Sequence, residues 1–191
     1  MRTVARCLVA VLAATAAYSQ PVEIEGVKLE PTAQLAGQSL QLNGAGLRTR
    51  AIFKVYVAGL YVPQKSTEPG ALLSQKGARR VAIHMLRNVD AGSFAEALND
   101  GLKANHSEAQ FAALKGQIDA LNATFKSIGN AKKGDAIYLD FAPDSGTRVV
   151  VNGTPHGDPI AGEEFFVALL RVWLGEKPVD AALKKGMLGG A

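Results

Sequence analysis

The distribution of apolar and polar residues predicts strands in the first half of this chain. Val22 to Leu29 (VEIEGVKL) alternates apolar and charged residues, which is typical of a half-buried strand. Leu40 to Gly46 predicts a second strand that runs into a glycine-rich turn. Ala51 to Val62 (AIFKVYVAGLYV) is rich in β-branched and aromatic residues and predicts a third strand. Arg80 to Leu86 predicts a fourth.

The middle of the chain has the apolar spacing of two amphipathic helices. Asp90 is a candidate N-cap for a helix that begins at about Ala91. Ser107 and Gln110 have the spacing of a capping box for the second helix. The apolar stripe of this second helix consists of Phe111, Leu114, Ile118, Leu121 and Phe125.

The last third of the chain predicts a hairpin followed by helices. Asp135 to Phe141 and Thr147 to Val151 have the pattern of two antiparallel strands. Glu163 opens a helix that ends at Gly175, and a short helix follows over Pro178 to Lys185. Strands, two helices, a hairpin and further helices do not make an alternating βαβ pattern. The order predicts an α+β fold in which an antiparallel sheet is covered on one face by helices.

Residues 1–19 have the pattern of a signal peptide. Two arginines precede an apolar run, Cys7–Ala14, that is too short to span a bilayer. The small residues of Ala17-Tyr18-Ser19 predict cleavage before Gln20, with a site after Ala14-Thr15-Ala16 as the alternative. An uncleaved anchor fits the length of the run less well. We therefore expect a periplasmic protein whose single domain covers residues 20–191.

Composition limits the partners and the chemistry of this domain. Cys7 is the only cysteine and would leave with the signal peptide, so no disulfide is expected. The formal net charge is +4, and two of the positive charges belong to the signal peptide, which argues against a nucleic-acid partner. No long apolar run follows the signal peptide, so stable membrane insertion after cleavage is not expected.

The sequence contains no phosphate-binding loop, dinucleotide fingerprint or nucleophile elbow. Its three histidines, His84, His106 and His156, do not have the spacing of metal ligands. We therefore predict neither a cofactor nor a metal.

The segment Gly44 to Val62 (GAGLRTRAIFKVYVAGLYV) combines basic and phenolic residues with apolar ones. If it formed one regular strand, one face would carry Arg48, Arg50, Lys54 and Tyr56. The other face would carry Phe53, Val55, Val57 and Tyr61. A guanidinium and a phenol along one face of a strand suit a carboxylate or another oxyanion. The competing interpretation is that these are ordinary surface residues whose polar ends face water.

The stretch Leu42 to Pro63 resembles the start of chalcone isomerase-like domains, in their secreted bacterial branch. The resemblance continues through Arg80 to Leu86, Phe94 to Leu102, Ile137 to Val151 and Gly162 to Glu176. It implies an open-faced β-sandwich in which helices cover a large antiparallel sheet. The family includes plant enzymes that close chalcones to flavanones and plastid relatives that bind fatty acids.

The resemblance also assigns positions in a site. Arg48, with Arg50 as the alternative, matches the arginine that anchors the reacting oxyanion in the plant enzymes. Tyr56 stands where a strand threonine polarises the ketone. Phe94 stands where a helix tyrosine would be, and Gly101 where an asparagine would be. The arginine is kept and the other polar partners are replaced, which argues against efficient flavanone formation because each lost donor typically costs a hundredfold or more in rate.

Three interpretations follow from these residues. The leading one is a protein that binds a small amphipathic acid, a fatty acid or similar, in an apolar cleft. Its ligand-binding residues would be Arg48, Tyr56, Arg50 and Phe94. The second is an isomerase or lyase that acts on an unknown unsaturated substrate. The third is a structural protein in which these side chains hold the sheet together without a ligand.

Overall fold

The centre of the fold is a seven-stranded antiparallel sheet whose strands pair in the order of the sequence. The computed structural model describes residues 20–190, so the expected signal peptide lies outside the described residues. The sheet order is β3-β4-β5-β6-β7-β8-β9, and every pair is antiparallel. The strands are β3 (Thr32–Leu35), β4 (Gln38–Arg50), β5 (Phe53–Val62), β6 (Arg79–Met85), β7 (Ala136–Ala142), β8 (Gly146–Val151) and β9 (Thr154–Ile160). The predicted α+β class is confirmed.

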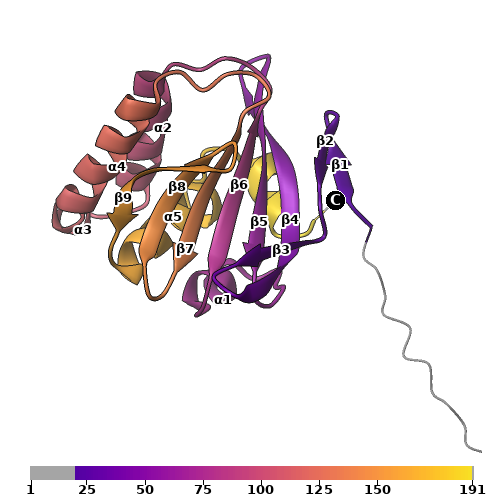
Figure 1. Cartoon of the computed structure of the whole chain (residues 1–191), viewed down its shortest axis with the longest axis horizontal. Coiled ribbons are helices and arrows are strands. Elements are labelled where there is room, and N and C mark those ends of the chain that lie inside the picture. The colour runs from indigo at the N-terminus through magenta and orange to yellow at the C-terminus, as the bar shows by residue number, and fades with distance from the viewer. Residues whose placement is uncertain (1–19, 191) are drawn as a thin grey trace, which may run out of the picture.

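The helices lie together on one face of this sheet (Figure 1). They are α1 (Pro69–Ser74), α2 (Ala91–Ala104), α3 (Glu108–Ala113), α4 (Lys115–Ile128), α5 (Glu163–Leu174) and α6 (Ala181–Met187). The predicted cap of α2 is confirmed, since Asp90 accepts a hydrogen bond from the backbone N–H of Ser93. The capping box at Ser107 is also confirmed, but the apolar stripe after it is divided at Leu114 between α3 and α4. No helix within residues 20–190 is long and apolar enough to cross a membrane.

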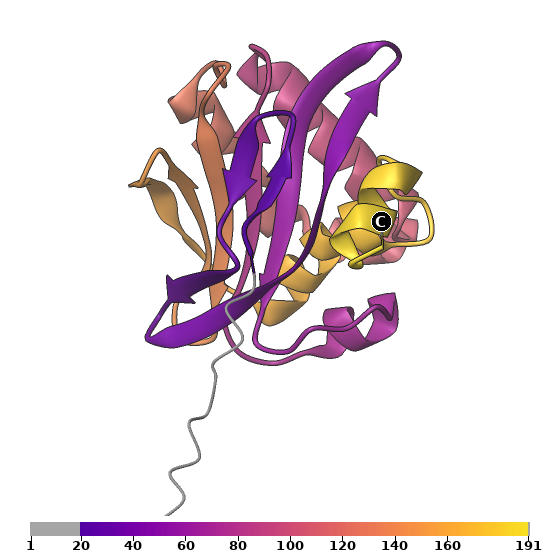
Figure 2. The ribbon, with the colours of Figure 1, turned by 90° about the vertical axis from the view of Figure 1, so that its right-hand side faces the viewer.

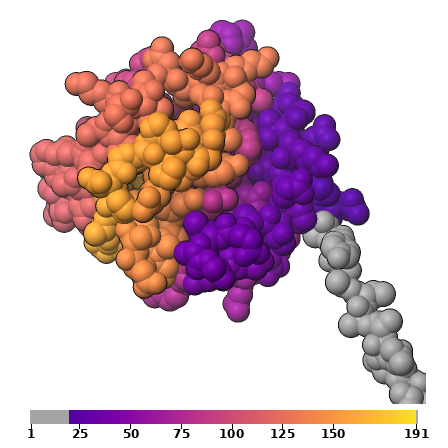
Figure 3. All heavy atoms as spheres, viewed as in Figure 1, coloured from indigo at the N-terminus to yellow at the C-terminus, as the bar shows by residue number. Residues whose placement is uncertain are grey.

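The opposite face of the sheet is partly covered by a small hairpin, β1 (Val22–Ile24) and β2 (Val27–Leu29). This hairpin is labelled in Figure 1, and its indigo atoms lie at the right side of the molecule in the same view in Figure 3. The single strand expected over Val22 to Leu29 was therefore wrong. Glu25 and Gly26 both have positive φ and turn the chain, and alternation continues on both sides of the turn. Leu29 packs with Leu40 and other side chains of the outer face in a separate apolar cluster.

Helix α5 is the most deeply buried helix, because it packs on β8 of the sheet and also contacts α1, α2 and α6. The described part contains one tryptophan, Trp173, and its side chain is fully buried here. Arg79 of β6 is also fully buried, with its guanidinium over the rings of Phe141 and Phe166. Its Nη2 donates to Glu163 Oε1 at 2.7 Å, while Nε and Nη1 have no partner among the described residues. The core beneath the helices thus contains one incompletely paired cation.

The glycine-rich segment is part of β4 and is not the turn that the sequence predicted. Residues 38–50 form one strand, and α6 packs directly across it. A Cβ atom on Gly44 would lie 2.2 Å from the carbonyl oxygen of Gly186, and one on Gly46 would lie 3.1 Å from the Cα atom of Leu183. Gly44 therefore permits a close approach of α6 to the sheet that a side chain would prevent, and a side chain at Gly46 would require small shifts of Leu183.

The turn lies later, at Ala51 and Ile52, so the strand expected over Ala51 to Val62 begins two residues too early. Strands β4 and β5 form a long hairpin, seen as the two long purple strands of Figure 2. Arg48 pairs with Tyr56 across this hairpin, and the register shifts between Arg48 and Thr49. The prediction that Arg48, Arg50, Lys54 and Tyr56 share one face of a single strand was wrong, because the chain turns between Arg50 and Phe53.

Strand β9 was missed because its sequence, TPHGDPI, contains two prolines. It is an edge strand paired only with β8, and proline is tolerated at a sheet edge. Gly157 has a positive φ and lies against Thr124 of α4, where a Cβ would meet the threonine Oγ1 at 2.3 Å. The close approach of β9 to α4 closes this end of the fold.

Candidate ligand-binding site

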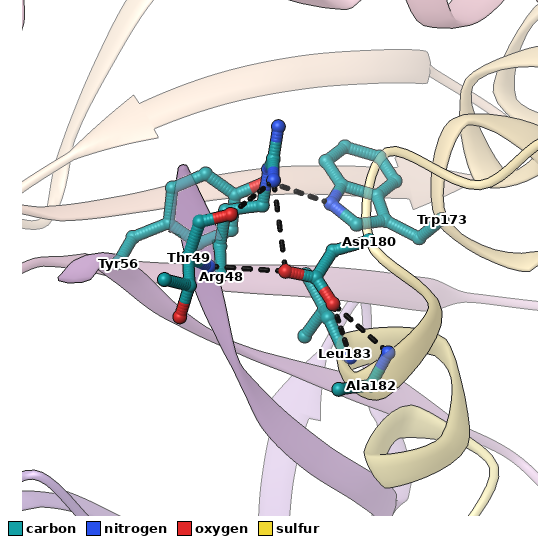
Figure 4. A network of polar contacts seen from close by, with 7 residues as sticks. All are labelled: Arg48, Thr49, Tyr56, Trp173, Asp180, Ala182 and Leu183. Carbon is teal, nitrogen blue, oxygen red and sulfur yellow. Dashed lines mark hydrogen bonds and ion pairs between the residues drawn. The ribbon is translucent and has the colours of Figure 1, made fainter. Parts of the chain in front are cut away.

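Arg48 and Tyr56 are neighbours on the helix-facing side of the β4–β5 hairpin. The Arg48 side chain is 20% exposed, so it lies at the boundary between the interior and solvent. Its Nη1 donates to the carbonyl oxygen of Thr49 at 2.5 Å and lies 3.6 Å from Oδ2 of Asp180 (Figure 4). The guanidinium is thus held beside a carboxylate that comes from the far end of the chain.

Asp180 is the N-cap of α6 and joins this helix to β4. Its Oδ1 accepts hydrogen bonds from the backbone N–H groups of Ala182 at 2.9 Å and Leu183 at 3.0 Å, and its Oδ2 accepts one from Thr49 at 3.1 Å. Burial by itself would raise the pKa of Asp180, but these backbone donors and Arg48 lower it below the usual value for aspartate. Asp180 is therefore a charged carboxylate in the folded protein.

Tyr56 carries a neutral hydroxyl in the interior. The side chain is 8% exposed, and its Oη accepts a hydrogen bond of 3.1 Å from Nε1 of Trp173. Burial raises the pKa of Tyr56, and the bond from Trp173 and the positive charge of Arg48 offset this only in part. Because the indole only donates, the phenol keeps its own O–H for another acceptor.

Of the other two candidate residues, Arg50 lies on the surface, and Phe94 belongs to the same main apolar cluster as Tyr56. Arg50 is exposed at the end of β4, where it pairs with Phe53 next to the turn. Phe94 lies in the core on α2, 6% exposed, with its ring 5.0 Å from that of Phe125 in an edge-to-face arrangement. The structure therefore brings Arg48 and Tyr56 together and leaves Arg50 on the surface.

Two hollows of the surface lie away from this pair. One, of about 370 Å³, is lined by α2, α3 and α4, and includes Lys103 and Phe111. The other, of about 600 Å³, lies between α4 and β9, and includes Thr124 and Pro159. Beneath Arg48 and Tyr56 the space between sheet and helices is filled by side chains of the main apolar cluster. Within residues 20–190 no cluster of three or more His, Cys, Asp or Glu side chains is placed to hold a metal ion.

A family model described as chalcone isomerase-like matches residues 21–189. The chain belongs to the chalcone isomerase-like family. Among solved structures, a fatty-acid binding protein of Arabidopsis thaliana superposes with a TM-score of 0.69 at 15% identity, over 88% of this chain and 96% of that chain. At this identity the likeness concerns the fold. The comparison with curated protein sequences found no match.

In this chalcone isomerase-like protein Gly101, where the resemblance implies an asparagine, lies at a close contact between two helices. A Cβ atom on Gly101 would lie 2.7 Å from Cγ1 of Val172 on α5. A side chain at this position would therefore require Val172 of α5 to shift. Phe94 likewise fills the core and carries no hydroxyl. Neither position supplies a polar group, which is the departure that the sequence indicated.

Sequence reasoning missed two residues of this polar network, Asp180 and Trp173. Asp180 precedes the last helix, and its position before Ala181 has the pattern of an N-cap, which was a usable signal. Its contact with Thr49 spans 131 residues, and no local pattern predicts it. Trp173 lies in an apolar helix, where its N–H requires a buried partner.

Proposed function

We propose that this protein binds a small amphipathic acid, a fatty acid or a similar molecule, with its carboxylate at Arg48 and Tyr56. The observation that carries the proposal is a partly buried guanidinium, placed beside a neutral phenol at the edge of an apolar interior. The fatty-acid binding protein with the same fold is consistent with it. The signal peptide pattern supports a periplasmic location for this activity.

The contact between Arg48 and Asp180 supports carboxylate chemistry at this position. Arg48 uses Nη1 for its contacts with Asp180 and Thr49. A guanidinium has five N–H donors in a planar fork, so Arg48 retains donors for a second carboxylate. The O–H of Tyr56 supplies a further donor from the neighbouring strand. A ligand carboxylate would therefore bind Arg48 together with Asp180, or it would take the place of Asp180 beside Arg48.

The apolar chain of the ligand would lie between the sheet and the helices, where the main apolar cluster now fills the space. Access requires a movable element, and α6 is the best placed. It is a single short helix, and Asp180 fastens it to β4 next to Arg48. A ligand that competes for Arg48 would weaken one of the contacts that hold α6 in place. Binding and the release of α6 would then be coupled.

The test is a titration of the purified mature protein with a fatty acid and with the alcohol of the same chain length. Arg48→Ala should weaken binding of the acid by about thirtyfold, because removing one partner of a buried charged hydrogen bond costs about 2 kcal/mol or more. Binding of the alcohol should be unchanged. Arg50→Ala is the matched control: the same change at an exposed arginine should leave both affinities unchanged.

Asp180→Asn separates this proposal from a second candidate, which the Arg48–Asp180 contact favours. In the second candidate Arg48 only fastens α6 to β4 and no ligand binds. Asparagine keeps the helix cap but not the charge. If Arg48 is a ligand anchor, Asp180→Asn should strengthen acid binding by up to about fivefold, the value of a partly exposed ion pair. If neither acid nor alcohol binds the parent protein, and both variants only lower the melting temperature, the second candidate is correct.

A further inference from the structure

The tip of the β4–β5 hairpin exposes two large apolar side chains next to one another. Ile52 is 87% exposed and Phe53 is 52% exposed. Within residues 20–190 the third large apolar side chain with comparable exposure is Val22, at 37%. Single exposed apolar residues are common on protein surfaces, but an adjacent pair at a projecting tip is a small apolar patch.

The residues of this turn are poor choices for the turn itself. Ala51 has a φ of +53°, a conformation that favours glycine, and Ile52 is β-branched. Two-residue hairpin turns prefer Gly, Asn and Asp, which tolerate such angles and interact well with water. Isoleucine at this position gains neither burial nor turn stability in the isolated protein. A local choice that stabilises nothing within the chain points to an external contact.

Positive charges surround the two apolar side chains. Arg50 precedes the turn and is exposed, and Lys54 follows it. The guanidinium of Arg87, on the segment after β6, lies over the ring of Phe53 at 4.5 Å from its centroid. Lys54 is paired with Glu25 at 2.7 Å, so its charge is partly compensated. Arg50 and Arg87 form no ion pair with another residue of the described range 20–190, so they supply the uncompensated positive charge at the tip.

A second basic segment lies at the same end of the sheet. The loop after α4 carries the exposed pair Lys132 and Lys133, and the backbone N–H of Lys133 donates to the side chain of Asn88, next to Arg87. Figure 1 shows this loop and the segment after β6 along the end of the sheet where the hairpin turns. The acidic groups here have partners: Asp90 caps α2, and Asp135 accepts a bond from the Asn152 side chain.

We propose that this tip, Arg50 to Lys54 with Arg87, docks on the surface of an anionic phospholipid bilayer. Ile52 and Phe53 would enter the acyl-chain boundary, and Arg50 and Arg87 would contact lipid phosphates. A bilayer fits better than a protein partner. A stable protein interface buries about 800 Å² on each side, far more than two side chains on a convex turn provide. Apolar side chains at a projecting tip can insert into a bilayer, and anionic lipids attract the positive charges next to them, which strengthens binding.

Such docking is peripheral and does not depend on ligand binding. It would bring Arg48 close to the lipid surface, since Arg48 lies two residues before the end of β4, or roughly 7 Å along the strand. The proposal goes beyond the proposed function and can be tested without it, because the vesicles used contain no free fatty acid.

The test is flotation of the mature protein with phosphatidylcholine vesicles, with and without phosphatidylglycerol. The protein should bind the anionic vesicles, and binding should fall as salt is added. Ile52→Ser should reduce the partition coefficient about tenfold. Arg50→Gln or Arg87→Gln should reduce it about fivefold on anionic vesicles only. Val22→Ser, the same kind of change at the far end of the β1–β2 hairpin, should have no effect.

Three results would overturn the proposal. The first is no binding to anionic vesicles at low salt. The second is equal binding of the parent and Ile52→Ser, which would place the lipid contact elsewhere. The third is a parent protein that is dimeric by light scattering and becomes monomeric on Ile52→Ser, which would assign the tip to a second copy of the chain. Thermal melts of each variant check folding, and they should be unchanged because these side chains are exposed.

Discussion

The close approach of α6 to β4 can be tested with a single methyl group. In Gly44→Ala, the new Cβ would lie 2.2 Å from the carbonyl oxygen of Gly186 and 2.6 Å from the backbone nitrogen of Gly189. Both are backbone atoms, so no side chain can rotate away. Cβ atoms essentially never lie within 3.0 Å of such atoms, so α6 must move away from β4.

The cost of this movement follows from what α6 buries. Forcing an extra methyl group into a packed contact costs about 1–3 kcal/mol. If α6 detaches, the protein also loses the burial of Leu183 and Met187, both fully buried, which contributes about 1.5–3 kcal/mol each. Asn43 would lose its 2.7 Å hydrogen bond to the carbonyl oxygen of Met187. We expect Gly44→Ala to lower the free energy of unfolding by about 2–5 kcal/mol, and the melting temperature by about 5–15 °C.

The assay is urea and thermal unfolding followed by far-UV circular dichroism, with Gly116→Ala as the matched control. A Cβ on Gly116, in the first turn of α4, meets nothing within 4 Å. The same change there should stabilise the protein by up to about 1 kcal/mol, because alanine has the higher helix propensity. Equal unfolding midpoints for the parent and Gly44→Ala would refute the packing of α6 on β4.

Three further predictions concern the polar groups of the interior. Tyr56→Phe leaves the buried N–H of Trp173 without an acceptor and should lower the free energy of unfolding by about 1–3 kcal/mol; an unchanged urea midpoint would contradict the hydrogen bond. Arg79→Met should be close to neutral or stabilising, since two nitrogens of Arg79 are buried without partners, whereas Arg79→Ala leaves a cavity and should cost about 3 kcal/mol by the same measurement. The pKa of Asp180 is lowered in the folded state, so its contribution to stability is complete above about pH 4 and is lost as the pH falls through the lowered value. As the pH is lowered below about 4, the urea midpoint should fall less steeply in Asp180→Asn than in the parent protein. The same pH dependence in both proteins would show that protonation of Asp180 does not affect stability.

The sequence predicted the features of the fold that are encoded locally. The α+β class, the caps at Asp90 and Ser107 and the β7–β8 hairpin depend on neighbouring residues, and all are present. The glycines of β4 were assigned to a turn because glycine breaks regular structure in most contexts. Their reason is α6, which comes about 140 positions later in the chain, as the separation of 144 residues between Asn43 and its partner Met187 indicates. β9 was missed for a similar reason, since only its place at the sheet edge makes its prolines acceptable.

The Arg48–Tyr56 pair was predicted from a wrong premise. The two residues were expected on one face of a single strand, but they lie opposite one another on two strands of a hairpin. On a single strand they would share a face but lie roughly 26 Å apart, at about 3.3 Å per residue, whereas the hairpin makes them cross-strand neighbours. Arg50 also distinguishes the two arrangements, because the hairpin turn places it on the surface next to Phe53. The other polar groups of the site come from residues that are distant in sequence, such as Asp180, which contacts Thr49. A local pattern of apolar and polar residues cannot predict such contacts.

The strand order also has a consequence for how the chain folds. Every strand of the large sheet pairs with its neighbour in sequence, and short turns join β4 to β5, β7 to β8 and β8 to β9. The β6–β7 pair is different, because residues 86–135, with three helices, lie between the two strands. Closing this segment costs about 2–3 kcal/mol more chain entropy than closing a turn of two or three residues. The N-terminal and C-terminal strands can therefore form early as separate local units, and the rate of folding should depend on the step at which β6 meets β7.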